Sequence, residues 1–539
     1  MSSPSATPET GNAPATHPSS WDPLRSRVYR RLFAAQFGSN IGTWMQSVAA
    51  QWFLIEHHAT DVVVALVQTA SQGPTLLLGL LAGALADVFD RRRLLIVLQS
   101  YAVVAALVLA ALAYAGYLTP TTLLVLTAAI GCAAALTAPA WQAIQPELIP
   151  REQIPAASTL ASMAANAARA IGPAIGGIAV AVAGAAAVFG INAVSFVGII
   201  VALLAWKRPT RHAPIQREPL GQAIINGLMF VKNGPIIRRI LLRAVLFLLP
   251  ASAVFALLPV AAAHRWHLSA GGYGAALGAI GCGAVLAVGV AAPLHRRLSA
   301  NRLLALSAAT YGLAPVAMAW LPFDAALPLL VLSGAAWLLT LTTLNAEAQM
   351  SLPRWVRARG LSVYLLVSTG TQAIGSYLWG VLATQAGLTL AMTVSAAVLG
   401  TVALSVVVLP LRPSIADVSI DVSNAWPTPT LMFEPCPNDG PVLVTVRYQV
   451  PQANVETFLE AMGAVRRSRL RTGGHSWRLY HSVEHPDRYL ERFTVTSWSE
   501  FERQRTQRWL DYDQDFMATA LAYTLEQQHD YYVARRVSR

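Results

Sequence analysis

Charged residues are scarce in this sequence. They make up 12% of its 539 residues, whereas hydrophobic residues make up 55% and the mean hydropathy is +0.48. An average soluble domain is about 25% charged. The composition therefore argues against an ordinary soluble protein and predicts a membrane protein. Many of its apolar runs reach the roughly 20 residues that a transmembrane helix needs.

Three other features are missing. The three cysteines, Cys132, Cys282 and Cys436, have spacings that suit neither a disulfide framework nor a metal site. The first 22 residues lack an apolar core, so they predict a disordered tail rather than a signal peptide. The sequence has no phosphate-binding loop of the pattern GxxxxGK[ST], which argues against direct use of ATP, and no cofactor or metal is expected.

The net charge of +12 belongs to the apolar part of the chain. Residues 1–411 hold 24 Lys and Arg against 11 Asp and Glu, whereas residues 412–539 hold 15 against 16. Basic loops in an apolar protein suit the anionic inner surface of a membrane. A lipid bilayer is therefore an expected partner, and nucleic acid is not.

Apolar runs separated by Gly, Pro and charged residues predict an all-α polytopic membrane protein with twelve transmembrane helices. The expected spans are residues 32–55, 62–86, 94–116, 120–142, 156–183, 186–206, 240–263, 271–293, 302–321, 326–346, 360–385 and 388–410. Of the 24 Lys and Arg, 22 fall in or beside one alternating set of connections. The opposite set has Arg265 alone, and Arg169 lies inside a span. Since positive loops stay in the cytoplasm, both termini are expected there.

The second half of the membrane part repeats features of the first. LIPR precedes AIGPAIGG in the first half, and SLPR precedes AIGSYLWG at the same spacing in the second. These matches predict two six-helix bundles related by an axis along the membrane normal. The expected domains are a disordered tail (1–24), an N-terminal bundle (25–206), a cytoplasmic central loop (207–239), a C-terminal bundle (240–411), a linker (412–440) and a C-terminal domain (441–536).

The stretch GALADVFDRRRLL, residues 83–95, concentrates charge between two apolar runs. The arginines at 91–93 could simply hold the loop in the cytoplasm. Asp87 lies one turn before Asp90 and shortly after the small residue Gly83, which suits an acid–base latch between closely packed helices.

This stretch resembles the loop signature of the major facilitator superfamily, and the resemblance covers about residues 25–411. It implies a transporter in which Gly83, Asp87, Arg91 and Arg92 belong to an inner gate. The matching loop of the second half, GVAAPLHRRLSANR, lacks the acid, so a symmetric latch is in doubt.

The stretch APAWQAIQPELIPREQIPAASTLASMAANAARAIGPAIGG resembles a bacterial subgroup that contains the enterobactin exporter and related efflux proteins. Its last part, RAIGPAIGG, is similar to the fifth-helix element of proton-coupled antiporters. The resemblance implies export of a small amphipathic compound, such as a siderophore or drug, across the bacterial inner membrane. The proton gradient would drive it.

Charged side chains inside predicted spans are candidates for the transport site, because they are rare there and often functional. Arg169 is the clearest case, and it shares a helix face with Asn166 and Pro173. In a central cavity it could attract an anionic substrate or respond to a proton. Alternatively, it bonds carbonyls freed near Pro173 or pairs with another helix.

Other polar residues give further candidates. Glu347 could carry a proton, although its place near a loop suits a structural ion pair. Gln46, Gln72 and Gln372 could line the cavity, or each could make an interhelical hydrogen bond.

The sequence of the C-terminal domain predicts a structure unlike that of the membrane part. Its pattern gives strands at 442–450, 475–483, 488–496 and 529–537, with helices at 452–470, 497–505 and 511–525. This order predicts a small ferredoxin-like α+β fold.

The C-terminal domain is similar to dimeric α/β-barrel proteins that include antibiotic-biosynthesis monooxygenases, which implies a homodimer contact. A cytoplasmic sensing or dimerising module without enzymatic activity is expected. One alternative is a bifunctional protein whose tail oxidises a quinol-like compound, and another is a transporter-derived sensor. Five residues could line an aromatic pocket or form an ordinary core: Trp477, Tyr480, His481, Tyr489 and Trp509.

Overall fold

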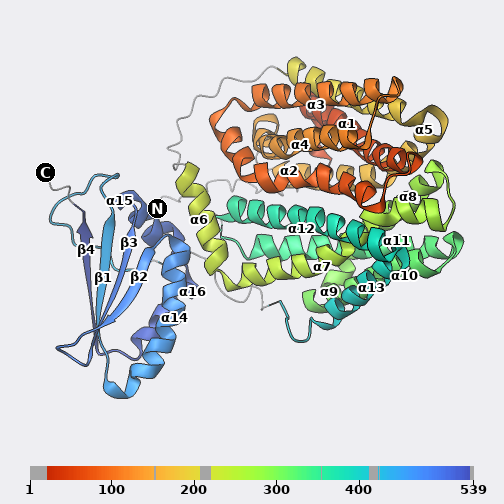
Figure 1. The fold of residues 1–539 in the computed structure, drawn as a ribbon. Coiled ribbons are helices and arrows are strands. Elements are labelled where there is room, and N and C mark those ends of the chain that lie inside the picture. Colours follow the sequence, from red (N-terminus) through yellow and green to blue (C-terminus); the bar gives the residue numbers. More distant parts are fainter. Residues whose placement is uncertain are drawn as a thin grey trace, which may run out of the picture.

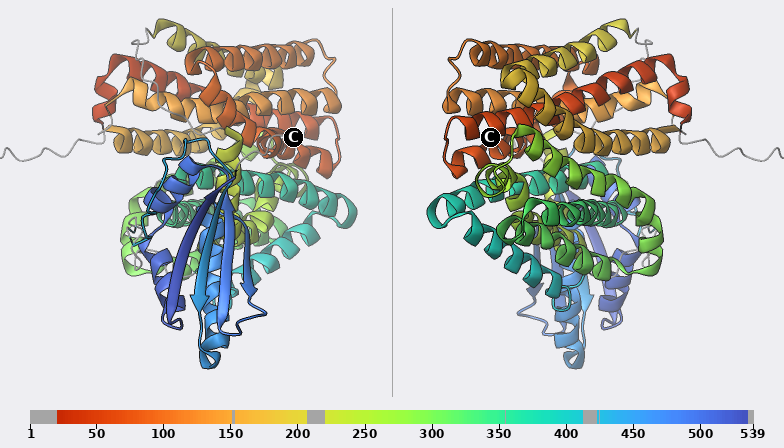
Figure 2. Two further views of the ribbon diagram at one scale, coloured as in Figure 1. Left: turned by 90° about the vertical axis from the view of Figure 1, so that its left-hand side faces the viewer. Right: turned by 90° about the vertical axis from the view of Figure 1, so that its right-hand side faces the viewer.

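The computed structural model describes residues 21–150, 153–206, 220–353, 355–411, 423 and 425–534. Two bundles of long helices lie side by side, and a small sheet with its own helices lies at one end of them (Figure 1; Figure 2). The end of the bundles beside the sheet is called the near end, and the opposite end is called the far end. The predicted N-terminal tail, central loop and linker each fall partly outside the described residues.

The first bundle is built from five helices. They are α1 (Arg27–Glu56), α2 (Asp61–Val88), α3 (Arg91–Tyr114), α4 (Pro120–Leu148) and α5 (Ile154–Ala205). The last of these covers two predicted spans, and the chain bends inside it at Gly184, where φ is +77°. Glycine suits this position because it has no Cβ to clash in a left-handed backbone conformation.

The second bundle begins at a proline, which suits the first turn of a helix because it has no N–H to leave unpaired. Its helices are α7 (Pro235–Val260), α8 (Ala270–Arg297), α9 (Ala300–Tyr311), α10 (Leu313–Trp320), α11 (Phe323–Met350), α12 (Arg357–Ala386) and α13 (Leu388–Leu404). The predicted span 302–321 is divided into α9 and α10 at Gly312. The last helix ends at Leu404 rather than at residue 410.

Within the described residues, eight helices are long and apolar enough to cross a membrane. α1, α12 and α13 coincide with three predicted spans but are shorter or less apolar than this standard requires. The chain is therefore a multi-pass membrane protein, and the count of twelve spans stays a prediction.

The bundles meet mainly along two helix pairs, α2 with α12 and α5 with α8. A Cβ added to Gly281 would lie 2.2 Å from the Cα of Ala170, and one added to Gly274 would lie 2.7 Å from the carbonyl oxygen of Pro173. Helices in lipid associate through close packing, so glycine at these positions lets the two halves approach.

The C-terminal domain holds one antiparallel sheet in the order β2-β3-β1-β4. Its strands are β1 (Val442–Gln449), β2 (His475–His481), β3 (Arg488–Val495) and β4 (Glu526–Val533), and its helices are α14 (Val455–Thr472), α15 (Trp498–Arg503) and α16 (Asp511–Leu521). Alternate residues of β1, including Val442, Val444 and Val446, pack with α14 and α16 in one core. The fourth strand begins at Glu526, three residues before the predicted start.

The central loop contains a helix that the sequence pattern did not predict, α6 (Leu220–Asn233), and it contacts both α12 and α14. The guanidinium carbon of Arg471 lies 5.7 Å from the ring centroid of Phe230 on this helix. The Phe230 ring meets Trp355 edge-on at 5.7 Å, and Arg508 lies 4.8 Å from the Trp355 ring. These contacts dock the C-terminal domain against the near end of the second bundle (Figure 1).

Candidate functional site

Arg169 lies where the two bundles face each other. Its guanidinium carbon is 5.4 Å from the ring centroid of Trp44 on α1. It also lies close enough to Tyr311, on α9 of the second bundle, for the two groups to interact electrostatically. Its Nε atom is buried without a hydrogen-bond partner, and Arg169 makes no ion pair within the described part of the chain.

The tyrosine opposite Arg169 is held by its own hydrogen bond. The Tyr311 hydroxyl donates to the carbonyl oxygen of Ala251 on α7 at 3.1 Å, which leaves the phenol oxygen's lone pairs for other groups. Arg169 as a whole is half-buried, and a cation with an aromatic ring beside it can still attract an anion. This arrangement favours the functional interpretation of Arg169 over the structural one.

Asn166, Arg169 and Pro173, which were predicted to share a helix face, lie in different environments. Pro173 is buried, and its carbonyl lies against Gly274 of α8. Asn166 is half-buried and has an interaction partner. Pro173 therefore positions α5 against the other bundle, whereas the guanidinium of Arg169 lies beside the ring of Trp44 on α1.

Hydrogen bonds join the two bundles at the far end. Tyr273 on α8 donates to Oε1 of Gln51 on α1 at 2.6 Å, and Nε2 of Gln51 donates to the carbonyl oxygen of Phe255 on α7 at 3.4 Å. The Trp52 ring stacks on Tyr273 with centroids 6.1 Å apart. Because Gln51 and Tyr273 are both buried, these bonds form a dry contact between the two halves.

The arginines of the charged loop after α2 contact their own bundle. Arg91 donates to Oε1 of Glu147 at 3.0 Å, which joins the start of α3 to the end of α4. Nε and Nη2 of Arg92 donate to the carbonyl oxygens of Leu203 and Leu204, at 2.7 and 3.0 Å, where α5 ends. A basic side chain is favourable beside the free carbonyls of a helix C-terminus.

Of the two acids in this loop signature, Asp87 and Asp90, the structure describes the side chain of Asp90 only. The surroundings of Gly83 and the side chain of Asp87 lie outside what the structure describes, so an inner gate between the halves stays a prediction. Asp90 caps α3, since its carboxylate accepts a hydrogen bond from the backbone N–H of Arg93 at 2.9 Å.

The predicted cavity-lining amides occupy different places. Gln46 is buried and accepts a hydrogen bond from Asn192 of the same bundle, which favours the interhelical interpretation. Gln372 donates to the carbonyl oxygen of Ser368 on its own helix at 3.2 Å. Gln72 is half-buried on α2.

Glu347 lies near the end of α11, within electrostatic reach of His295 on α8. Nε2 of His295 is 3.0 Å from the hydroxyl of Thr343, one helical turn before Glu347. Glu347 is half-buried there, so both of its predicted roles, proton carrier and member of a structural ion pair, stay open.

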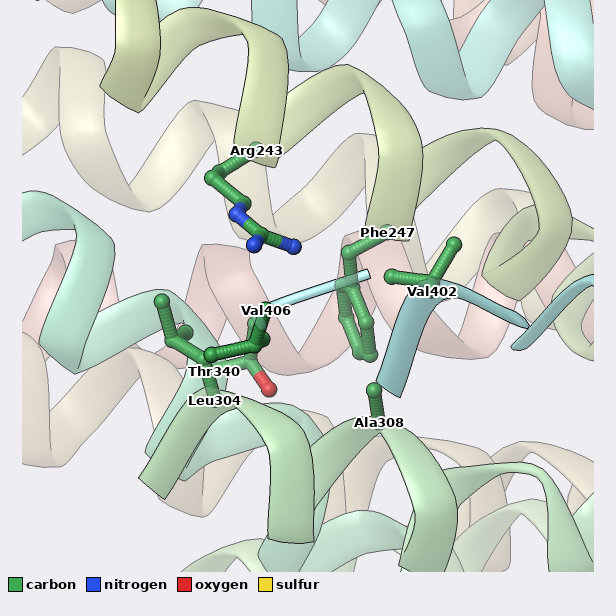
Figure 3. Close-up of a pocket in the computed structure, with 7 residues that line it drawn as sticks. All are labelled: Arg243, Phe247, Leu304, Ala308, Thr340, Val402 and Val406. Atoms are coloured by element: carbon green, nitrogen blue, oxygen red, sulfur yellow. The ribbon is translucent and has the colours of Figure 1, made fainter. Parts of the chain in front are cut away.

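A small cavity inside the second bundle is not a substrate site. Its volume is about 10 Å³, which is the space that a single water needs. Figure 3 shows Arg243 and Phe247 among its lining residues. Arg243 donates to the hydroxyl and the carbonyl oxygen of Ser405, at 2.9 and 3.0 Å, so it anchors the end of α13.

The C-terminal domain contains a buried charge network. Glu491 accepts hydrogen bonds from Nε of Arg469 at 3.1 Å, from the Tyr448 hydroxyl at 2.7 Å and from Nε1 of Trp477 at 2.8 Å. Burial, together with the negative charge of Glu491, raises the pKa of Tyr448 well above its usual value. Tyr448 is therefore a neutral donor throughout the physiological range.

The other residues of the predicted aromatic pocket are dispersed. His481 stacks on Tyr489 with centroids 4.5 Å apart, Tyr480 is 41% exposed, and Trp509 is buried in the core. Among the described residues, no group of three His, Cys, Asp or Glu side chains could hold a metal ion.

The sequence pattern did not single out Trp44, Tyr273 or Tyr311. A tyrosine inside an apolar span is a weak signal, because its hydroxyl must find a partner there. The pattern cannot say which helix supplies that partner, so the pairs with Gln51 and Ala251 required the structure.

Two helix bundles with a half-buried arginine between them and hydrogen bonds joining them at one end are the arrangement expected of a membrane transporter. The family model for transmembrane secretion effectors of the major facilitator superfamily matches residues 18–537, and the chain belongs to this family.

Two relatives are transport proteins. The chain is 30% identical over 174 residues to the staphyloferrin A transporter of Staphylococcus aureus, an alignment that covers 32% of this chain and 44% of the relative. It is 26% identical over 397 residues to the multidrug efflux pump Tap of Mycolicibacterium fortuitum, covering 69% and 93%. The chain thus spans less than half of the first relative and most of the second.

Solved structures of transporters share the fold of the bundles. The nucleoside transporter NupG matches with a TM-score of 0.57 at 11% identity, covering 71% of this chain and 99% of NupG. An inward-facing bacterial homologue of the human lysosomal transporter Spinster matches with a TM-score of 0.55 at 14% identity, covering 72% and 95%. At these identities the likeness concerns the fold alone.

Proposed function

We propose that the protein is a secondary active exporter that moves a small amphipathic compound, such as a siderophore or a drug, by alternating access. The position of Arg169 between the bundles carries this proposal, because a cation there can bind an anionic group of the substrate. The staphyloferrin A transporter and the multidrug efflux pump among its relatives support the substrate class.

The proposed topology has twelve spans in the bacterial inner membrane, with both termini in the cytoplasm. Arg91, Arg92 and Arg357 lie at helix ends on the near side, so the near end faces the cytoplasm under the positive-inside rule. The C-terminal domain is then cytoplasmic. The bond between Gln51 and Tyr273 closes the external side, as expected of a state that loads substrate from inside.

Export against a gradient requires an energy source, and we assign this role to the proton gradient. An anionic substrate beside Arg169 offsets the cost of burying that cation, so an occupied site shifts the balance between the two states. Glu347 is the proposed proton-carrying group near the cytoplasmic end.

A second candidate function belongs to the C-terminal domain. Its strand order β2-β3-β1-β4 is the one expected of a ferredoxin-like fold. A quinol or antibiotic monooxygenase activity of this domain is the alternative, and turnover of quinols by the purified full chain would support it.

Inside-out vesicles with an acidic interior provide the test. Siderophores and amphipathic drugs are added singly, and proton release is recorded with a pH-sensitive dye. Release by one class of compound, retained in Arg265→Ala and lost in Arg169→Ala, is the expected result. Arg265 is an exposed arginine at the far end and serves as the matched control. Equal release by wild type and Arg169→Ala would refute the role of Arg169.

A further inference from the structure

The C-terminal domain contains a partly open cavity that is separate from the space between the bundles. Its volume is about 50 Å³, several times the roughly 10–15 Å³ that one water needs. α14, α16, β4 and the end of the linker all contribute to its walls. The lining includes Trp426, Arg469, Trp509, Gln514, Met517, Leu521, Gln527 and His529.

Arg469 is the charged group in this wall, and it is 1% exposed. Aromatic rings surround its guanidinium, whose carbon lies 4.1 Å from the centroid of Trp426, 4.6 Å from Trp509 and 5.0 Å from Phe493. Such rings stabilise the cation through its faces and leave only its in-plane N–H groups for hydrogen bonds.

One nitrogen of the Arg469 guanidinium makes a hydrogen bond and another does not. Nε donates to Glu491, whereas Nη1 is buried and has no hydrogen-bond partner. Tyr448 and Trp477 also donate to Glu491, so its negative charge is shared among three donors. A buried N–H group of a charged side chain is costly when it makes no hydrogen bond. A ligand in the cavity could accept that hydrogen bond.

His529 supplies a second unsatisfied group in the same wall. Its Nδ1 is buried without a partner, while its Nε2 is 3.4 Å from Oε1 of Gln527. Burial, reinforced by the positive charge of Arg469, lowers the pKa of His529 to about 4. The imidazole is therefore neutral near pH 7, and the charge that borders the cavity is that of Arg469.

We propose that this cavity is a binding site for a small carboxylate of the size of acetate, held by Nη1 of Arg469. A carboxylate lies naturally in the plane of a guanidinium, and its charge strengthens the bond. Met517 and Leu521 provide an apolar wall for a methyl group. The small volume favours an acid of this size over an aromatic one. This site does not depend on the proposed transport function.

Hydrogen exchange of the full chain in lipid nanodiscs tests the proposal. Sodium acetate is added at constant ionic strength, which is kept with sodium chloride. The expected result is saturable protection of peptides from α16 and β4, reaching about tenfold slower exchange at ten times the dissociation constant. Acetamide, which has the same shape without the charge, and benzoate, which is larger, should give none.

Two variants separate binding from folding. Leu521→Phe fills the cavity and should abolish the protection, whereas Leu525→Phe alters a residue that is 67% exposed and should preserve it. Arg469→Lys keeps the charge, lacks Nη1 and should weaken the acetate effect. Equal protection by acetamide, protection retained in Leu521→Phe, or no protection by acetate would overturn the proposal and leave a water-filled cavity.

Discussion

The hydroxyl of Tyr273 lies 2.6 Å from Oε1 of Gln51, and this hydrogen bond joins the second bundle to the first at the far end. Gln51 continues the link by donating to the carbonyl oxygen of Phe255. Because these bonds join the two bundles, they must break before the bundles can separate at the far end. A contact made in one state alone biases the balance between states.

Tyr273→Phe removes this hydroxyl and keeps the ring that stacks on Trp52. Hydrogen bonds between membrane helices contribute about 0.6–1.7 kcal/mol, so the population open at the far end should rise roughly 3- to 20-fold. Distances between spin labels on the two bundles measure this population. Tyr117→Phe alters a tyrosine that is 77% exposed and is the control. Identical distance distributions in Tyr273→Phe and wild type would contradict the prediction.

Glu491→Gln leaves the buried guanidinium of Arg469 without its carboxylate. Loss of one partner of a buried ion pair costs about 3–5 kcal/mol, so the C-terminal domain should become much less stable. Arg447→Gln breaks the pair with Asp530, in which Arg447 is 56% exposed, and should cost less than about 1 kcal/mol. Hydrogen exchange of domain peptides within the full chain compares the two. Similar losses of stability in the two variants would show that burial does not set the contribution of these ion pairs.

The depressed pKa of His529 predicts an acid-sensitive C-terminal domain. Its folded-state pKa of about 4 lies below the ordinary value of 6.5, so the unfolded chain binds the proton more readily. The stability associated with neutral His529 is therefore present above about pH 6.5 and is lost as the pH falls toward 4, by up to about 3 kcal/mol.

The matched variants for this pH effect are His529→Gln and His485→Gln. The first should flatten the loss between pH 6.5 and 4, and the second, at an exposed histidine, should leave it unchanged. Hydrogen exchange corrected for its intrinsic pH dependence provides the measurement. A wild-type profile that matches His529→Gln would exclude His529 as the cause.

Trp355→Ala should loosen the C-terminal domain from the near end. The ring of Trp355 contacts Phe230 of α6 and lies 4.8 Å from the guanidinium carbon of Arg508. One aromatic pair and one cation–π contact together contribute about 1–3 kcal/mol. Exchange in α6 and α14 should therefore rise by roughly tenfold, while α1 stays unchanged. Trp320→Ala, at a residue that is 61% exposed, should affect neither helix.

A helix could be predicted from the sequence where its own residues form a long apolar run. Long apolar runs located α2, α3 and α4, because burying such a run in lipid outweighs other local preferences. α6, with the amphipathic sequence LGQAIINGLMFVKN, was missed because it is too short to span a membrane and is stabilised by contacts with α12 and α14 that come from distant sequence. The bend at Gly184 was anticipated as a boundary between two spans.

The candidate site was predictable to a similar, limited degree. Arg169 could be chosen because a charge inside an apolar span needs an explanation wherever it points. Gln46 could not be assigned, because a buried amide suits a cavity and an interhelical hydrogen bond equally well. Its contact with Asn192 depends on how two helices rotate against each other.

The sequence by itself determined that the chain spans a membrane, that a separate α+β domain follows, and that Arg169 is unusual. These properties rest on composition and local periodicity, which need no knowledge of distant contacts. The tertiary structure alone decided that Arg169 lies beside Trp44, that Gln51 binds Tyr273 and that Arg469 borders a pocket with His529. Each of these pairs joins segments far apart in the chain, and packing geometry selects among partners that are chemically equivalent in the sequence.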